Sequence, residues 1–124
     1  MNNNTKNFLL VCSDPEFCLY TKTTALTLTK LNVQATVDVT DNLADALKIS
    51  GSQNLNTIIL DLGLKTFDPL KFIKDVRSKS HSNNIKIISF SSEEINRKEI
   101  FEAGCDSIMT KKEIQTILPN IIQF

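Results

Sequence analysis

The sequence alternates, five times in succession, between a short apolar run and a longer segment whose apolar residues recur at helical spacing. The apolar runs are 8–12, 33–39, 57–61, 85–90 and 106–109, and each is too short for a stable helix. The helices between and after them are expected at 15–31, 41–49, 69–78, 91–104 and 113–122. Strict alternation of this kind predicts a parallel sheet with helices packed on both of its faces.

Individual residues mark the expected ends of these helices. Ser91 and Glu94 have the spacing of a capping box, so Ser91 or Ser92 is expected to cap the fourth helix, which ends at Gly104. Pro119 lies inside the last helical segment. It is expected to bend or interrupt that helix, because proline removes one backbone N–H donor.

Composition is that of one ordinary globular domain. With 124 residues, 41% hydrophobic and 23% charged, the chain is expected to form a single domain over residues 1–124, in which 1–6 is a short flexible lead-in. The 14 basic and 14 acidic residues balance, which argues against a nucleic-acid partner. No apolar run approaches the roughly 20 residues of a membrane span. The three cysteines and the lone His81 lack metal-ligand spacing, and free thiols indicate a reducing, cytoplasmic location.

The polar residues at the ends of the predicted strands are the candidates for function. In parallel sheets with helices on both faces, binding sites collect at the carboxyl ends of the strands, where the strand order reverses. The residues at or just after the carboxyl ends of the apolar runs are Cys12, Ser13, Asp14, Asp61, Ser91 and Lys111.

Four segments, in this order, resemble the receiver domain of bacterial two-component response regulators. They are LLVCSDPEF, TIILDLGL followed by FDPLKFIKDVR, IKIISFSSE, and FEAGCDSIMTKK, and together they cover essentially the whole chain. The alanine-glycine pair before the fifth strand and the threonine-lysine pair after it are the most specific features. The resemblance implies a flavodoxin-like α/β fold, a doubly wound five-stranded parallel sheet of order 2-1-3-4-5 flanked by five helices.

The resemblance also implies a role for each matching residue. Asp61 stands where receivers carry the aspartate that accepts a phosphoryl group from a histidine kinase. Gly63 stands where a backbone carbonyl helps to hold Mg²⁺. Ser91 matches the hydroxyl that contacts the phosphoryl group and signals its presence, and Lys111 matches the lysine that pairs with the acceptor and the phosphoryl oxygens.

Two departures from the family pattern bear on that chemistry. Receivers end their first strand with a pair of acids that hold Mg²⁺, and here Cys12 and Ser13 occupy those places. Asp14 follows, at a position that is not a main metal ligand in the family. Ile108 stands where the family usually has a tyrosine or phenylalanine that swings inward after phosphorylation.

Loss of the acidic pair is expected to weaken Mg²⁺ binding by orders of magnitude. Mg²⁺ prefers oxygen ligands that include one or two carboxylates, and a thiol is a poor ligand for so hard a cation. Asp14 could substitute, but adjacent strand residues point to opposite faces. Without the metal, an ion pair between Asp61 and Lys111 is the expected state of the pocket.

Each site residue also has a purely structural interpretation. Asp61 could cap the turn after its strand, Ser91 could only cap a helix, and Ile108 could be an ordinary core residue. Cys12 could be a small buried apolar residue. A redox role for Cys12 would require that Lys111 lower the pKa of its thiol.

The expected function is that of a stand-alone, non-enzymatic signalling adaptor with a degenerate receiver site and no cofactor. Its partner is expected to be a histidine kinase or a downstream effector, bound through the surface formed by 91–104, 106–109 and 113–122. The alternative is a working receiver that uses Mg²⁺ and is phosphorylated on Asp61 by a histidine kinase. A flavin carrier is disfavoured, because the loop after the first strand lacks a phosphate cradle rich in glycine, serine and threonine.

Overall fold

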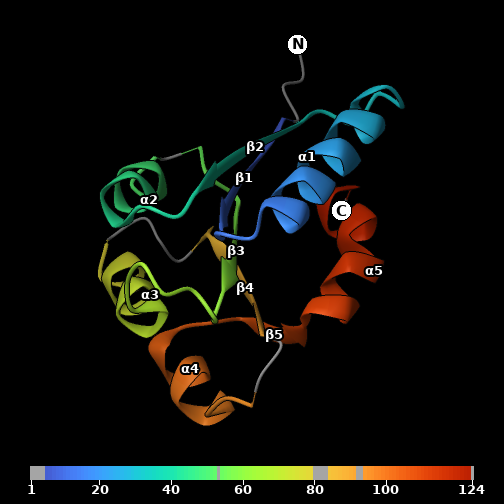
Figure 1. The fold of residues 1–124 in the computed structure, drawn as a ribbon. Helices are drawn as coiled ribbons and strands as arrows, with labels where there is room; N and C mark the ends of the chain where they lie inside the picture. The colour runs from blue at the N-terminus through green and yellow to red at the C-terminus, as the bar shows by residue number, and fades with distance from the viewer. Residues whose placement is uncertain (1–4, 53, 80–83, 92–93, 124) are drawn as a thin grey trace.

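The computed structural model describes residues 5–52, 54–79, 84–91 and 94–123. Five strands alternate with five helices along the chain (Figure 1). The strands are β1 (Lys6–Val11), β2 (Ala35–Thr40), β3 (Thr57–Asp61), β4 (Lys86–Ser91) and β5 (Ser107–Thr110). The helices are α1 (Pro15–Thr29), α2 (Leu43–Ser50), α3 (Pro69–Arg77), α4 (Arg97–Ala103) and α5 (Lys111–Gln123).

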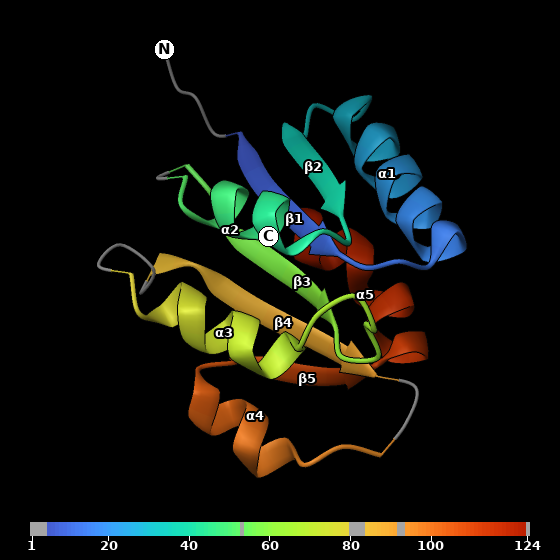
Figure 2. The ribbon, with the colours of Figure 1, turned by 60° about the vertical axis from the view of Figure 1, so that its left-hand side comes forward.

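All strand pairs are parallel, and the strand order is β2-β1-β3-β4-β5. Helices α1 and α5 cover one face of the sheet, and α2, α3 and α4 cover the other (Figures 1 and 2). This is the flavodoxin-like arrangement that the sequence predicts. Within the described residues, no helix has both the length and the apolar content needed to cross a bilayer.

The central strands are apolar along their whole length because both of their faces are buried. In β1, Leu9 and Val11 join the core beneath α2, α3 and α4, whereas Phe8 and Leu10 join the core beneath α1 and α5. These four side chains are at most 1% exposed. The short apolar run at 8–12 therefore correctly indicated a strand that is buried on both faces.

Helix α4 begins later than the predicted capping box requires. Its N-cap is Asn96, whose side chain accepts a hydrogen bond from the backbone N–H of Glu99. Strand β4 continues through Ser91, so the predicted cap at Ser91 with Glu94 is wrong. The alternative cap Ser92 lies outside the described residues, as does His81.

The predicted lead-in 1–6 overlaps the first strand at residue 6. Lys6 is the first residue of β1 and pairs with Ala35 of β2. Its ammonium group also donates to the carbonyl oxygen of Gln123 at 3.0 Å, which joins the start of the sheet to the end of α5. Residue 6 therefore belongs to the folded domain, and residues 1–4 lie outside the described part of the chain.

Gly104 ends α4 with a backbone that few other residues adopt. Its φ is +120°, and a Cβ built at this position would lie 2.5 Å from the side chain of Arg77. The Arg77 guanidinium donates to the carbonyl oxygen of Gly104 and forms an ion pair with Asp106 at 2.8 Å. Glycine is thus required both by conformation and by this close contact, which aligns the chain for β5.

Helix α5 runs without interruption through Pro119, so of the predicted bend or interruption the interruption is wrong. A proline at position 119 leaves the carbonyl oxygen of Gln115, four residues earlier, without its usual helical N–H donor. The hydroxyl of Tyr20 on α1 donates to that oxygen at 2.7 Å. A side chain of the neighbouring helix therefore replaces the missing hydrogen bond.

Replacing Tyr20 with phenylalanine should destabilise the protein by about 1 kcal/mol, because the Gln115 carbonyl loses its donor. In a Pro119→Ala background, residue 119 supplies an N–H to the same carbonyl, so the cost of Tyr20→Phe should fall toward zero. Urea unfolding of the four chains of this double-mutant cycle measures the coupling. Equal costs of Tyr20→Phe in both backgrounds would show that the two residues act independently.

Candidate functional site

The carboxyl ends of the strands meet at one edge of the sheet. Asp61 is the last residue of β3 and lies beside Phe90 of β4, and Ser91 lies beside Thr110 of β5. The loop from β1 to α1 carries Cys12, Ser13 and Asp14 to the same edge. We name the group formed by Cys12, Asp14, Asp61 and Lys111 the Asp61 pocket.

The Asp61 carboxylate accepts a hydrogen bond on each of its oxygens. Oδ1 accepts from the backbone N–H of Gly63 at 2.8 Å, and Oδ2 accepts from the thiol of Cys12 at 3.5 Å. The backbone N–H of Leu64 also donates to the Asp61 carbonyl at 3.3 Å, which closes a turn after β3. Asp61 therefore stabilises this turn, as its structural interpretation requires, while its half-buried carboxylate still faces the edge.

Cys12 is a buried thiol within the core beneath α1 and α5. Burial raises the pKa of Cys12 to about 12, and the negative charge of Asp61 adds to the increase. The thiol is therefore protonated at neutral pH and can donate to Asp61. A reactive thiolate would need a lowered pKa, so the structure argues against the redox role considered for this residue.

Lys111 pairs with Asp14, not with Asp61 as the sequence predicts. The ammonium group of Lys111 contacts Oδ2 of Asp14, and this is one of two ion pairs among the described residues. Asp14 is the N-cap of α1, and its Oδ1 accepts from the backbone N–H of Glu16 at 3.0 Å. As the N-cap of α1, Asp14 faces Lys111. The carboxylate that pairs with Lys111 therefore belongs to the β1–α1 loop and not to β3.

Lys111 is the first residue of α5 and follows β5 directly. The helix start is a reciprocal capping box: the Glu113 backbone N–H donates to the Thr110 hydroxyl, and the Thr110 N–H donates to the Glu113 carboxylate, both at 3.0 Å. Hydrogen bonds from Thr110 to the Glu113 carboxylate, that of the Thr110 backbone N–H first, lower the pKa of Glu113. The spacing of Thr110 and Glu113 is the sequence signal for this box, which is absent from the predicted helix caps.

The Asp14–Lys111 pair should make stability fall at both extremes of pH. The hydrogen bond from Lys111 lowers the pKa of Asp14, so its contribution is present above the unfolded pKa and is lost as acid protonates the carboxylate. The same bond raises the pKa of Lys111, so that contribution is present below the unfolded pKa and is lost in alkali. Both side chains are partly exposed, which limits the effect to about 1 kcal/mol.

Asp14→Asn tests this dependence. Urea unfolding between pH 3 and pH 11 should show a smaller loss of stability at both extremes in the variant. Asp75→Asn, on α3 and away from the pocket, is the control. A variant whose stability profile matches that of the unmodified chain would contradict the pairing.

The remaining predicted residues lie around the pocket rather than in it. Ser13 is exposed. Ser91 is 8% exposed and lines a groove of about 500 Å³ together with Arg97 of α4 and Ile108 of β5. Ile108 is half-buried and packs against the core beneath α2, α3 and α4, so its structural interpretation accounts for its position.

The donor atoms of the Asp61 pocket do not fit Mg²⁺. Cys12 is a protonated thiol and the Asp14 carboxylate is paired with Lys111, so Asp61 is left as the single acid of the pocket without an ion pair. Mg²⁺ needs several oxygen ligands in near-octahedral geometry. Among the residues that the structure describes, no group of three or more histidine, cysteine, aspartate or glutamate side chains is placed to bind a metal ion.

The fold is similar to those of several solved receiver domains. A response regulator from Hahella chejuensis is 20% identical, with a TM-score of 0.78, and the match covers 95% of this chain and 92% of that chain. The signal receiver domain of a DNA-binding response regulator from Colwellia psychrerythraea 34H is 17% identical, with a TM-score of 0.72 and coverage of 96% and 99%.

A third similar structure contains a metal. It is the receiver domain of the sensor histidine kinase PA1611 from Pseudomonas aeruginosa PAO1, with a magnesium ion coordinated in its active site cleft. It is 19% identical, with a TM-score of 0.73 and coverage of 95% and 98%. At these identities the similarity establishes the fold alone.

Comparison with curated protein sequences finds no match. The family model of the response regulator receiver domain matches residues 10–123, which include every residue of the Asp61 pocket. The sequence motifs, the strand order and this match agree. The chain belongs to the response regulator receiver domain family.

Proposed function

We propose that this receiver domain is a signalling adaptor that acts through contacts with other proteins and is impaired in Mg²⁺-dependent phosphorylation of Asp61. The observation that carries the proposal is the arrangement of the Asp61 pocket. A neutral thiol, Cys12, stands in place of an acid and donates to Asp61, and Asp14 already neutralises Lys111. Binding, rather than catalysis, is then the activity of the chain, and a cytoplasmic signalling role agrees with the family.

Charge balance is the physical reason. Transfer of a phosphoryl group to a carboxylate adds negative charge beside a group that is already negative, and cations must neutralise it. Lys111 would have to leave Asp14 to serve this purpose. The phosphorylated state would then contain an unpaired Asp14 carboxylate as well as the new phosphoryl charge, so its formation is disfavoured.

Receiver domains work with histidine kinases and effector proteins, and one surface of this chain suits such a partner. We place it on α4, β5 and α5, where Ser91, Arg97 and Ile108 line the groove described above. Phe101 of α4 is 44% exposed. A surface that carries an exposed aromatic ring and a groove with charged and apolar walls is typical of a protein contact.

Intact-mass measurement after incubation with acetyl phosphate and Mg²⁺ tests the proposal. The unmodified chain should gain no phosphoryl group, and neither should Asp61→Asn. A phosphoryl adduct that forms on the unmodified chain and is lost in Asp61→Asn would instead support the alternative, a functional phosphoacceptor that relays phosphate from a histidine kinase.

A further inference from the structure

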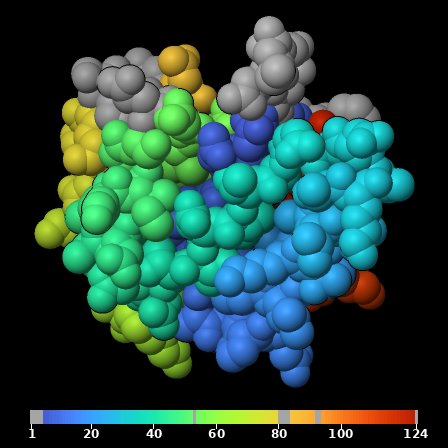
Figure 3. Space-filling model, turned by 90° about the horizontal axis from the view of Figure 1, so that it is seen from above, coloured from blue at the N-terminus to red at the C-terminus, as the bar shows by residue number. Residues whose placement is uncertain are grey.

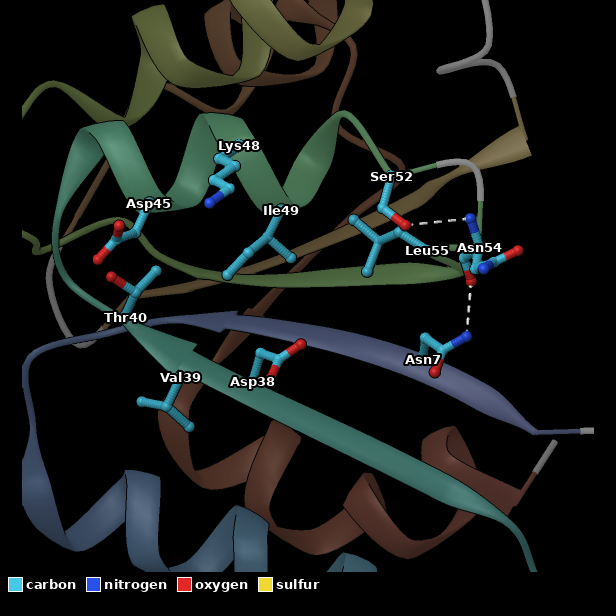
Figure 4. A pocket seen from close by; sticks show the side chains of 10 residues that line it. All are labelled: Asn7, Asp38, Val39, Thr40, Asp45, Lys48, Ile49, Ser52, Asn54 and Leu55. Atoms are coloured by element: carbon cyan, nitrogen blue, oxygen red, sulfur yellow. Dashed lines mark hydrogen bonds between the residues drawn. The ribbon is translucent and has the colours of Figure 1, made fainter.

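A groove of about 560 Å³ lies between β2 and α2, apart from the Asp61 pocket (Figure 4). In the space-filling view, atoms of β1 are visible between α2 and β2 (Figure 3). The volume is within the range of small-molecule sites, roughly 300–1,000 Å³. The groove is lined by Asn7, Asp38, Val39, Thr40, Asp45, Lys48, Ile49, Ser52, Asn54 and Leu55.

The groove exists because one side of β2 is polar. Ala35, Val37 and Val39 pack against the core beneath α1 and α5. Asp38 and Thr40 alternate with them, so they lie on the opposite side of the strand, which faces α2. The buried residues of α2 are Ala46 and Ser50, and Ala46 belongs to the core that contains Leu9 and Val11 of β1.

Three exposed charged side chains line the groove, and none has an ion-pair partner among the described residues. They are the carboxylates of Asp38 and Asp45 and the ammonium group of Lys48. By contrast, the neutral polar residues already bond to one another: Asn7 donates to the carbonyl oxygen of Asn54 at 2.8 Å, and Asn54 N–H donates to Ser52 at 3.3 Å.

Apolar side chains complete the lining. Leu55 is buried, with 6% exposed, and Ile49 is half-buried and extends from α2 toward the groove (Figure 4). The groove therefore offers two negative groups, one positive group and an aliphatic surface. A matching ligand carries two cations, one anion and an aliphatic stem.

We propose that this groove binds a small basic amino acid. The two cationic groups of such a molecule pair with Asp38 and Asp45, its carboxylate pairs with Lys48, and its methylene groups pack on Ile49 and Leu55. Charge-assisted hydrogen bonds of this kind are stronger than neutral ones, which gives the site selectivity for charge. This proposal does not depend on the Asp61 pocket, so it and the proposed function can each be wrong without affecting the other.

Titration of the isotope-labelled protein with L-arginine, followed by NMR, tests the site. Backbone amide signals of Asp38, Asp45 and Lys48 should shift and saturate at about millimolar concentration. Asp38→Asn should weaken binding about tenfold, the loss expected for one charge-assisted hydrogen bond. Asp75→Asn, which removes a carboxylate from α3, is the matched control and should bind as the unmodified chain does.

Two analogues of L-arginine distinguish recognition of all three of its charged groups from a general attraction of cations to Asp38 and Asp45. Agmatine lacks the carboxylate, so Lys48→Gln should weaken the binding of L-arginine but not that of agmatine. Acetyl-L-arginine amide presents the side chain as it occurs within a protein, and it should bind at least tenfold more weakly than L-arginine. Absence of saturable shifts, equal binding by Asp38→Asn and Asp75→Asn, or equal affinity for the amide would overturn the proposal.

Discussion

Cys12→Asp should create a Mg²⁺-dependent stability that the unmodified chain does not have. The new carboxylate would lie beside Asp61, because the Cys12 sulfur is 3.5 Å from Asp61 Oδ2. In the absence of a divalent cation, a charge at this 2%-exposed position lacks a partner and should cost about 3 kcal/mol. Adding Mg²⁺ should recover much of that loss, because ligand binding to the native state stabilises it by mass action.

Urea unfolding with and without Mg²⁺ measures this effect. Cys12→Asn is the control, because asparagine has nearly the same shape as aspartate but carries no charge. Its stability should not depend on Mg²⁺. If Cys12→Asp gains no more from Mg²⁺ than Cys12→Asn does, the missing acid is not what limits metal binding at this edge.

Phe17→Ala should destabilise the protein by about 3–5 kcal/mol, the usual cost of removing a buried phenylalanine side chain. Phe17 lies in the first turn of α1, is fully buried and stacks on Phe90 of β4 with ring centroids 4.6 Å apart. The lost ring also leaves a cavity under the helix whose N-cap is Asp14. Urea unfolding gives the change in the free energy of unfolding.

Leu19→Ala on the same helix is the matched control for Phe17→Ala. Leu19 is 68% exposed, so its truncation should change stability by no more than about 0.5 kcal/mol. Comparable losses for the two variants would mean that α1 is not anchored to the sheet through Phe17. A loss confined to Phe17→Ala would show that packing stabilises a helix whose threonine-rich sequence has low intrinsic helix propensity.

The sheet was predictable from the sequence because both of its faces are buried. Strand β3 has the bounds predicted for it, 57–61, and the strand order follows from the family resemblance. Helix ends were less predictable. Ser91 and Glu94 satisfy the spacing of a capping box, but β4 continues through Ser91, and sheet pairing with Thr110 outweighs the local cap. Pro119 stays inside α5, where Tyr20, distant in sequence, donates to the Gln115 carbonyl that lacks its helical donor.

The composition of the site was predictable, but its pairing was not. The strand-end rule brings Cys12, Asp14, Asp61 and Lys111 to one edge, as expected. Which acid contacts Lys111 depends on the direction of side chains in the β1–α1 loop, and sequence spacing does not specify that direction. The Cys12–Asp61 hydrogen bond escaped prediction for the same reason, because it needs a position and a protonation state that only the packed core provides.

Mg²⁺ titration followed by NMR tests whether the Asp61 pocket can hold a divalent cation. We expect that it cannot, because Asp14 is paired with Lys111 and too few free anionic ligands remain. The amide signals of Asp61 and Gly63 should then stay unchanged at millimolar Mg²⁺. Saturable shifts of these signals, accompanied by release of Lys111 from Asp14, would contradict the account.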